Sequence, residues 1–449
     1  MIGFIKHIVL AICLQLFPLL EGAYAQSNEL LTLEDCLEKT IDKNSDFLSI
    51  QNMEIIREQN RKILKTALFP ELSFSSDINQ FVQNSKVVFT DNILPVSEIT
   101  GARTSGMTAS VNTGLNLVDW GQTVVQLKAQ NYSYQAQNIK DNQSKNEIIL
   151  MVCKTYFDCL ISQEIGRVVY EKIENSQQIM SLAALKVEIG ASDSLEYYQA
   201  LINYEQDVNS GILVNSMLVE SKNNLKILVG LGFTNEFNLD NSLLNINDLK
   251  LNSSSVWDPE TTLQLISLEN DLLEIQKLEK ANRWDILPDI SLFAGYGFSN
   301  QTFQNGIVQQ NTALGFSYGL SVNYRFGSVK NTIHQNNVLK IQESNKILQI
   351  NNQKNVEQNE FNSLQLRIEQ LSLLTKSSQT VMIMTQRTLK NSMLNYELGS
   401  MTLTDLRFTQ DQYLNSKIEL NRVLADYFIC HLELYAQTNN LEEWILQIL

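Results

Sequence analysis

The side chains that most often act as nucleophiles or metal ligands are few in this sequence and poorly spaced for either role. The cysteines are Cys13, Cys36, Cys153, Cys159 and Cys430. No two of them form the CxxC pair typical of zinc sites, and they are too scattered for a disulfide framework. Cys153 and Cys159 lie six residues apart on one predicted helix, which is poorly phased for a bridge and favours core packing.

Histidine is equally scarce. After the N-terminal segment the sequence contains only His334 and His431, both on predicted helices, where packed or exposed side chains are the simpler interpretation. There is no HExxH motif or phosphate-binding loop, and neither GxSxG nor GxGxxG occurs at a predicted strand-to-helix junction. We therefore predict no catalytic residue, no metal site and no cofactor, and we expect that the protein is not an enzyme.

The charge balance argues against nucleic acid as a partner. The sequence has 49 acidic and 34 basic residues, a formal net charge of −15. A phosphate backbone needs a concentrated positive face, and this excess has the opposite sign.

The first 25 residues are typical of an export signal. Lys6 and His7 precede an uncharged run over 8–20, and Ala-Tyr-Ala at 23–25 has the small-x-small pattern that signal peptidase recognises. We predict a signal peptide over residues 1–25, followed by the mature chain.

Two other interpretations of this segment are weaker. A membrane anchor would need about 20 apolar residues to span hydrocarbon as a helix. A lipoprotein signal is disfavoured because the bulky Ile12 precedes Cys13. No later stretch looks like a transmembrane helix, since the longest uncharged window, 290–324, is rich in Gly, Ser, Asn and Gln. Any later membrane span must therefore come from a closed barrel of strands.

The remaining sequence repeats one pattern at a spacing of just over 200 residues, far longer than solenoid repeats. The matched pairs are Leu-Phe-Pro at 68–70 with Ile-Leu-Pro at 286–288, Asp-Trp-Gly at 119–121 with Arg-Phe-Gly at 325–327, and Glu-Ile-Gly-Ala at 188–191 with Glu-Leu-Gly-Ser at 397–400. We predict two structural repeats, 26–245 and 246–449, each with a helix, two strands, a long helix and a shorter helix.

Two segments per repeat show the period of two that is typical of a strand with one apolar face. In the first repeat the odd positions of 107–117 are mostly apolar, and in the second the even positions of 316–326 are apolar and rich in aromatic residues. We expect the preceding strand of each pair near 72–78 and 290–298, followed by turn-rich stretches at about 80–106 and 299–312. A soluble, half-buried sheet is the alternative interpretation of these strands.

The helices are unusually long. Residues 328–398 contain no Gly or Pro, and 122–189 are interrupted only by Gly166. A continuous helix over the first of these ranges would be roughly 100 Å long. Shorter helices are expected from Ser194 to about Val229 and from Thr402 to about Thr438, so that each repeat forms a helical hairpin. A solid coiled-coil rod is the alternative interpretation.

This order of elements resembles the TolC-like outer-membrane efflux proteins over essentially the whole mature chain. The most specific segments are Leu-Thr-Leu-Glu-Asp-Cys-Leu at 31–37, the two strands that follow Pro70 and Pro288, and the turns that begin at Gly190 and Gly399. The resemblance implies a mixed α and β membrane protein with an internal two-fold repeat. Three chains, with four strands each, would form one 12-stranded outer-membrane β-barrel, continued by a periplasmic α-helical coiled-coil barrel.

The resemblance also implies partners and a location. It implies a homotrimer in the outer membrane that extends into the periplasm, in contact with outer-membrane lipid, a periplasmic adaptor protein and an inner-membrane pump. Such a trimer would be a passive exit duct for a tripartite efflux pump or a type I secretion system.

Residues near the two Gly turns correspond to the periplasmic gate of similar proteins. Those proteins have an acidic residue six positions after each Gly, which here are Glu196 and Asp405, and a tyrosine three residues before the second Gly, here Tyr396, which is expected to bond toward Glu196. Phe408 occupies the position of a second acidic ring, where an apolar plug would replace charge.

The turns themselves correspond to the adaptor contact. The resemblance assigns this contact to Gly190, Gly399, Ser400 and Met401, although Met401 stands where the family has a basic residue. The simpler interpretation of Glu196 and Asp405 is an acid in the first turn of a helix, stabilised by the helix dipole.

Two other functions remain open at this stage. An exported coiled-coil structural or adhesive protein would have no pore, and a passive porin would keep the barrel but bind no adaptor. The duplicated Gly turns favour the exit duct.

Overall fold

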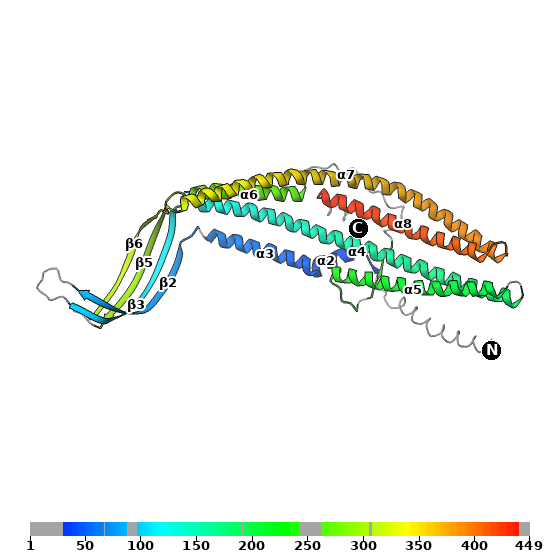
Figure 1. Cartoon of the computed structure of the whole chain (residues 1–449), viewed down its shortest axis with the longest axis horizontal. Helices are drawn as coiled ribbons and strands as arrows, with labels where there is room; N and C mark the ends of the chain where they lie inside the picture. Colours follow the sequence, from blue (N-terminus) through cyan, green and yellow to red (C-terminus); the bar gives the residue numbers. More distant parts are fainter. Residues whose placement is uncertain are drawn as a thin grey trace. The chain divides into compact units, whose positions relative to one another are not determined.

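The computed structural model describes residues 30–66, 68–87, 97–190, 193–234, 236–241, 262–304 and 308–439 (Figure 1). The predicted signal peptide and the predicted boundary between the repeats at 245–246 lie outside these ranges. Both therefore stay predictions.

Each half of the chain contains a helical segment, two strands, a long helix and a shorter helix. The first half comprises α2 (Leu33–Lys43), α3 (Ser45–Thr66), β2 (Glu71–Val87), β3 (Ser97–Val118), α4 (Gln122–Glu188) and α5 (Ser194–Val229). The second comprises α6 (Leu263–Trp284), β5 (Asp289–Phe303), β6 (Gln310–Asn323), α7 (Ser328–Glu397) and α8 (Leu403–Gln437). A short parallel pair joins β1 (Leu30–Leu31) to β4 (Asn238–Leu239).

The long strands form one antiparallel sheet in the order β2-β3-β5-β6. The central β3–β5 pairing joins the two halves of the chain. Among the described strands, β2 and β6 each have a single neighbour, so each presents one edge of unpaired backbone groups.

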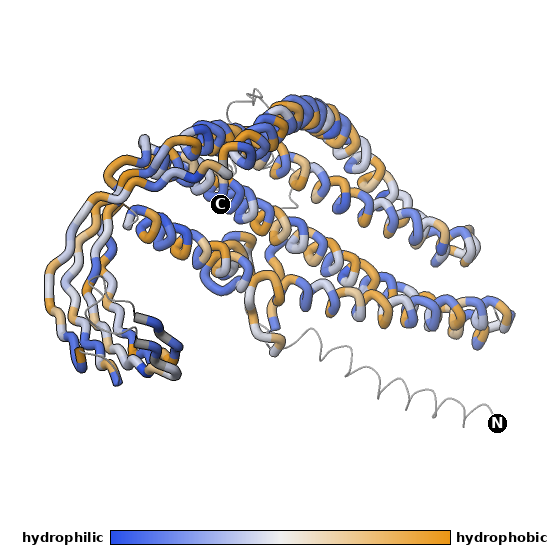
Figure 2. The backbone as a smooth tube through the Cα atoms, turned by 60° about the vertical axis from the view of Figure 1, so that its left-hand side comes forward, coloured by the Kyte–Doolittle hydropathy of each residue, from blue (hydrophilic) through white to orange (hydrophobic). Residues whose placement is uncertain are grey.

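The register separates apolar and polar residues onto the two faces, because residues paired across strands share a face. One row on the apolar face crosses the sheet as Phe74, Val111, Tyr296 and Phe316. The adjacent row on the other face is Ser75, Ser110, Gly297 and Gly315. This arrangement confirms the predicted one-sided strands, and Figure 2 shows the resulting alternation of hydropathy along them.

The predicted turn-rich stretches, about 80–106 and 299–312, were wrong in extent. The β2–β3 ladder continues through Gln80↔Ser105 to Val87↔Ser97, and β5 and β6 extend to Phe303 and Gln310. A segment rich in Ser, Thr, Asn and Gln has the composition of a turn, but here cross-strand backbone hydrogen bonds keep the chain extended.

The predicted alternation also fails at Leu117. A register shift between Asn116 and Val118 leaves Leu117 without a partner on β5. Such a β-bulge ends the strict period of two just before the strand gives way to α4.

The long helices are continuous, as predicted. Helix α4 has 67 residues and runs through Gly166, and α7 has 70 residues, which makes each roughly 100 Å long. Apolar and polar residues are interspersed along both helices (Figure 2). Within the described ranges, no helix combines the length and apolar character needed to cross a membrane.

The described residues divide into two compact units, each of which draws on both halves of the sequence. One unit contains residues up to 54, 139–266 and from 352 onward, and the other contains 55–138 and 267–351. The first unit holds the largest core cluster, where Phe157 stacks on Phe428 with ring centroids 5.4 Å apart. Cys153 and Cys159 are fully buried free thiols in this cluster, as core packing predicts, and burial raises the pKa of Cys153 to about 12.

His431 is an exception to the rule that buried polar groups are hydrogen-bonded. Its side chain is fully buried in α8 and packs edge-on against Tyr427 at 4.6 Å, and neither ring nitrogen has a hydrogen-bond partner. Burial lowers the pKa of His431 from 6.5 to about 4.

This burial predicts a pH-dependent stability. Between pH 6.5 and about 4 the unfolded chain binds a proton at His431 that the folded chain excludes, so stability should fall as the pH falls through this range. His431→Phe should raise the unfolding temperature at pH 5 by a few degrees and reduce the difference between pH 7.5 and pH 5, measured by circular dichroism. His334→Phe, at an exposed site, is the control. An unchanged pH difference in His431→Phe would contradict this account.

Candidate functional site

The two Gly turns that the sequence singles out connect α4 to α5 and α7 to α8, and both lie in the first unit. Gly190 and Gly399 each have φ of 74°, in the left-handed region. A Cβ at either position would meet no atom within 4 Å. Backbone conformation, and not lack of space, therefore requires glycine at both turns.

Capping residues start the helix that follows each turn. The Asp193 side chain accepts hydrogen bonds from the backbone N–H groups of Leu195 and Glu196, and the Thr402 side chain accepts one from Asp405. These contacts satisfy backbone donors that would otherwise have no partner in the first turn.

An apolar cluster joins the ends of the four helices. Its buried members are Ala183, Ala200, Leu389, Tyr396, Leu403 and Leu406. They come from α4, α5, α7 and α8, so the two hairpins of one chain pack against each other next to their turns. Met401 is partly buried against the same cluster.

Tyr396 and Glu196 form the hydrogen bond that the sequence predicts. The Tyr396 hydroxyl donates to Glu196 Oε1 at 3.0 Å, and the tyrosine side chain is almost fully buried. Burial, followed by the hydrogen bond and charge of Glu196, raises the pKa of Tyr396, so the hydroxyl remains a neutral donor. The gating role of the pair stays a prediction.

Lys186 completes this contact, and sequence reasoning did not identify it. Its Nζ lies 3.7 Å from Glu196 Oε1 and 4.1 Å from the centroid of the Tyr396 ring. It also donates to the Tyr396 carbonyl oxygen at 3.4 Å. The only indication of this contact in the sequence is a basic residue four positions before Gly190.

Asp405 and Phe408 are exposed, whereas Tyr396 is buried. Asp405 is exposed, and its carboxylate accepts a hydrogen bond from the Thr402 hydroxyl at 2.7 Å. Asp405 therefore lies in the first turn of α8, next to the N-cap residue Thr402. Phe408 is 64% exposed and packs into no described core cluster. Neither residue contacts the Tyr396–Glu196 pair in a described interaction.

A buried ionic network also links the hairpins, and sequence reasoning missed it. The guanidinium of Arg407 on α8 donates to both carboxylate oxygens of Asp207 on α5, and the Ser176 hydroxyl on α4 donates to Asp207 as well. Lys172 Nζ lies 3.2 Å from Asp207 and 2.7 Å from Asp411. The network therefore ties three helices together.

The electrostatics of Asp207 favour its ionised form. The side chain is only 2% exposed, and burial by itself would raise its pKa. Hydrogen bonds from Arg407 and Ser176 and the positive charges of Lys172 and Arg407 outweigh burial, so the pKa is lowered below 3.8. The carboxylate therefore stays charged throughout the mildly acidic range.

Removal of the Asp207 charge should loosen the hairpins. Asp207→Asn leaves Arg407 and Lys172 without their buried counterion, and breaking a buried pair in this way costs about 3–5 kcal/mol. We expect faster hydrogen exchange in the neighbouring turns of α5 and α8, measured by mass spectrometry. Because the pKa of Asp207 is lowered, its stabilising contribution should persist from pH 7 to pH 5 and be lost only below about 3.8.

The matched control is Asp411→Asn, because the Asp411 side chain is 44% exposed. Its ion pairs should contribute about 1 kcal/mol or less, as is typical of ion pairs at a protein surface. Equal exchange rates in wild type and Asp207→Asn would rule out a stabilising role for the network.

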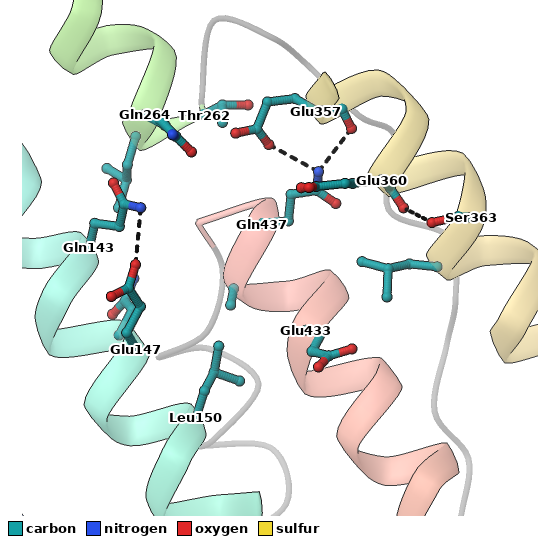
Figure 3. A pocket seen from close by; sticks show the side chains of 14 residues that line it. Gln143, Glu147, Leu150, Thr262, Gln264, Glu357, Glu360, Ser363, Glu433 and Gln437 are labelled. Atoms are coloured by element: carbon teal, nitrogen blue, oxygen red, sulfur yellow. Dashed lines mark hydrogen bonds between the residues drawn. The ribbon is translucent and has the colours of Figure 1, made fainter. Parts of the chain in front are cut away.

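A polar cavity of about 390 Å³ is the second feature of this unit (Figure 3). It lies where α4, α7 and α8 meet the start of α6, and its acidic lining residues are Glu147, Glu357, Glu360 and Glu433. Glu357 accepts a hydrogen bond from Gln437 at 3.0 Å, and Glu433 pairs with Lys154 at 2.6 Å. Across the described part of the chain, no group of three or more His, Cys, Asp or Glu side chains is arranged to hold a metal ion.

The sequence Gly-Phe-Ser-Tyr-Gly at 315–319 has the spacing of a hydrolase motif but not its setting. Ser317 lies within β6 and donates to the Gly295 carbonyl oxygen at 3.4 Å. It is not at a turn between a strand and a helix, so this serine is a strand residue of the polar sheet face.

Solved structures with the same fold are outer-membrane channels. The chain is similar to CusC, with a TM-score of 0.73 and 13% identity over 90% of this chain and 91% of that chain. It is similar to the CmeC outer membrane channel of Campylobacter jejuni, with a TM-score of 0.73 and 15% identity over 92% and 88%. The MtrE outer membrane channel of Neisseria gonorrhoeae, in its open state, gives a TM-score of 0.69 and 13% identity over 91% and 89%.

The chain therefore shares the fold of these channels, with a β domain and long helical hairpins. Residues 38–231 also match the outer membrane efflux protein family. The matched residues make up less than half of the 449-residue chain. No curated protein sequence matches it.

Proposed function

We propose that the protein is the outer-membrane exit duct of an efflux or type I secretion machine. The family match over 38–231 and the fold of the whole chain support a channel. The finer proposal is a passive conduit, since an inner-membrane pump would supply the energy and a periplasmic adaptor would connect the pump to the duct.

The observation that carries this proposal is the sheet. It has an apolar face with exposed aromatic residues such as Phe316 and Tyr318, a polar face rich in Ser and Gly, and two edges without a described neighbour. An open edge in hydrocarbon leaves backbone groups without hydrogen bonds. Three copies of the sheet, joined edge to edge, would close a barrel with lipid outside and water inside.

Fractionation and native mass test this assembly. We expect the protein in the outer-membrane fraction and, after correction for bound detergent, a mass three times that of the mature chain. A soluble species of any mass would contradict the duct and favour the coiled-coil structural protein. A single-chain mass in detergent would contradict the shared barrel.

For the gate we propose Glu196, Tyr396, Asp405 and Phe408. The buried Tyr396–Glu196 hydrogen bond links the hairpins next to their turns, which supports a closing contact. Asp405 and Phe408 are exposed within one chain, so they are available to face their copies across a three-fold axis. Rings of Asp405 carboxylates would favour cations and would repel one another.

For the adaptor contact we propose the turns at Gly190, Gly399, Ser400 and Met401. Exposed apolar side chains lie beside both turns, namely Ile189 at 69% and Leu398 at 72% exposure. An apolar patch at a helix-hairpin turn is a suitable surface for a helical partner.

Loss of the Tyr396 hydroxyl should favour the open state. Tyr396→Phe removes one hydrogen bond to Glu196 and keeps the packing, which costs about 1 kcal/mol per chain. We expect a higher mean single-channel conductance in planar bilayers and greater antibiotic sensitivity of cells. Tyr198→Phe, at an exposed tyrosine on the same hairpin, is the control. The same conductance in both variants would remove Tyr396 from the gate.

Asp405→Ala tests the proposed ring of Asp405 carboxylates in the same assays. Loss of the carboxylate should loosen the closed end and reduce cation preference. Since Asp405 also forms the Thr402 cap, Thr402→Ala is needed as a control for helix fraying. Unchanged conductance and unchanged antibiotic leakage would show that Asp405 acts only in the cap.

A further inference from the structure

A groove of about 540 Å³ lies between α3 and α4 in the second unit. Its apolar lining consists of Leu64, Leu68 and Phe69 from the end of α3 and the residues after it, together with Leu127 from α4. The basic lining residues are Arg57, Arg61 and Lys65. None of the described lining residues is acidic.

The positive charge of this groove is unusual for the protein. The chain carries a net charge of −15, yet Arg57, Arg61 and Lys65 follow one another at intervals of four, on one face of α3. The Arg61 guanidinium lies 5.5 Å from the Tyr134 ring centroid, which orients it on the groove wall. Its ion pair with Glu58 is long, at 3.9 Å, and both side chains are 42% exposed, so most of its charge is available to a ligand.

One end of the groove adjoins the sheet. Phe69 is 70% exposed and lies two residues before β2. Other aromatic residues lie where strands meet helices in the same unit, including Trp120 and Phe326, which are 48% and 83% exposed. Exposed aromatic residues at the ends of membrane strands are typical of the interface between hydrocarbon and water.

Helix geometry relates the basic residues to this interface. Helix α3 ends at Thr66, so at a rise of 1.5 Å per residue Lys65 lies about 1.5 Å and Arg61 about 7.5 Å from this end along the helix axis. The headgroup layer on each side of a bilayer is roughly 5–8 Å thick. Lys65 would therefore lie within this layer and Arg61 at its aqueous side, while Leu64 and Leu68 lead from them toward the hydrocarbon.

We infer that the α3–α4 groove binds one anionic phospholipid of the periplasmic leaflet, with its phosphate at Lys65 and Arg61 and an acyl chain along Leu64, Leu68 and Leu127. This inference rests on the proposed outer-membrane location. Charge complementarity selects the headgroup, because a lining without carboxylates offers no partner for the amine of a zwitterionic lipid.

Native mass spectrometry of the delipidated trimer in detergent tests this inference. Phosphatidylglycerol and phosphatidylcholine with the same acyl chains are the two probes. We expect up to one phosphatidylglycerol per chain, bound about tenfold more tightly than phosphatidylcholine, a preference equivalent to about 1.4 kcal/mol. The Arg61→Gln/Lys65→Gln double variant should lose this preference.

The matched control is Lys62→Gln/Lys128→Gln, which removes the same charge from α3 and α4 at positions outside the groove lining. Lys65→Gln alone, at an exposed site, provides a variant that should fold normally and lose part of the preference. Equal affinity of the wild-type protein for both lipids, or equal loss in the control, would overturn the inference.

A neighbouring copy of the chain is the competing occupant. The four described native cysteines are buried, so a maleimide should label Leu64→Cys selectively in the lipid-free trimer. Rapid labelling that phosphatidylglycerol slows would support the lipid site, and a protected cysteine would show that a second copy covers the groove. Failure of lipid binding in a trimer recovered from the outer membrane would overturn this site and leave the proposed function intact.

Discussion

The unpaired backbone at the two edges of the sheet is the constraint on which the rest of this structure depends. In water such an edge is tolerated, but in hydrocarbon each unpaired N–H or C=O group costs several kcal/mol, roughly the price of a lost hydrogen bond in an apolar medium. Strand β2 forms one edge of the sheet and β6 forms the other. The β3–β5 pairing joins the two halves of the chain, so the four strands form a single sheet. One chain cannot pair the backbone groups of its own two edges, because four strands are too few to close a barrel. In the proposed outer-membrane duct, identical copies would close the barrel, and assembly would then be a condition of membrane insertion.

The internal repeat gives the helical unit its two similar hairpins, but the contacts between them are not symmetric. Asp207 on α5 is matched to Arg407 on α8, and Glu196 is matched to Tyr396, so each link joins one hairpin to the other. A buried carboxylate with three cationic or hydroxyl partners is costly to expose once any partner moves away. Movement of one hairpin against the other would therefore have to break the Asp207 network as well as the hydrogen bond of Tyr396. These two contacts therefore fix how the two hairpins of one chain pack next to their turns.

Surface charge is distributed unevenly over a strongly acidic chain. Basic residues gather along one face of α3, whereas acidic residues line the cavity between α4, α7 and α8. The two regions differ in how their charges are satisfied. In the acidic cavity, Gln437 and Lys154 contact the glutamates directly, while the basic groove combines its charge with an apolar floor. Apolar side chains beside basic ones can bind the two parts of an amphiphile, whereas a simple ion would use only the charge. We therefore interpret the basic groove, but not the acidic cavity, as a lipid site.

Local features of the sequence determined the elements. The absence of Gly and Pro over 328–398 predicted α7 nearly to the residue, and the alternation at 316–326 predicted which face of β6 is apolar, because both depend on backbone preference and side-chain period. The Tyr396–Glu196 contact could be predicted only through the family resemblance. The tertiary structure alone decided the length of the β2–β3 ladder, the contact of Lys186 with Glu196 and the network of Asp207 with Arg407. Asp207 and Arg407, 200 positions apart, meet only because the two hairpins pack together, and no local sequence pattern encodes that packing.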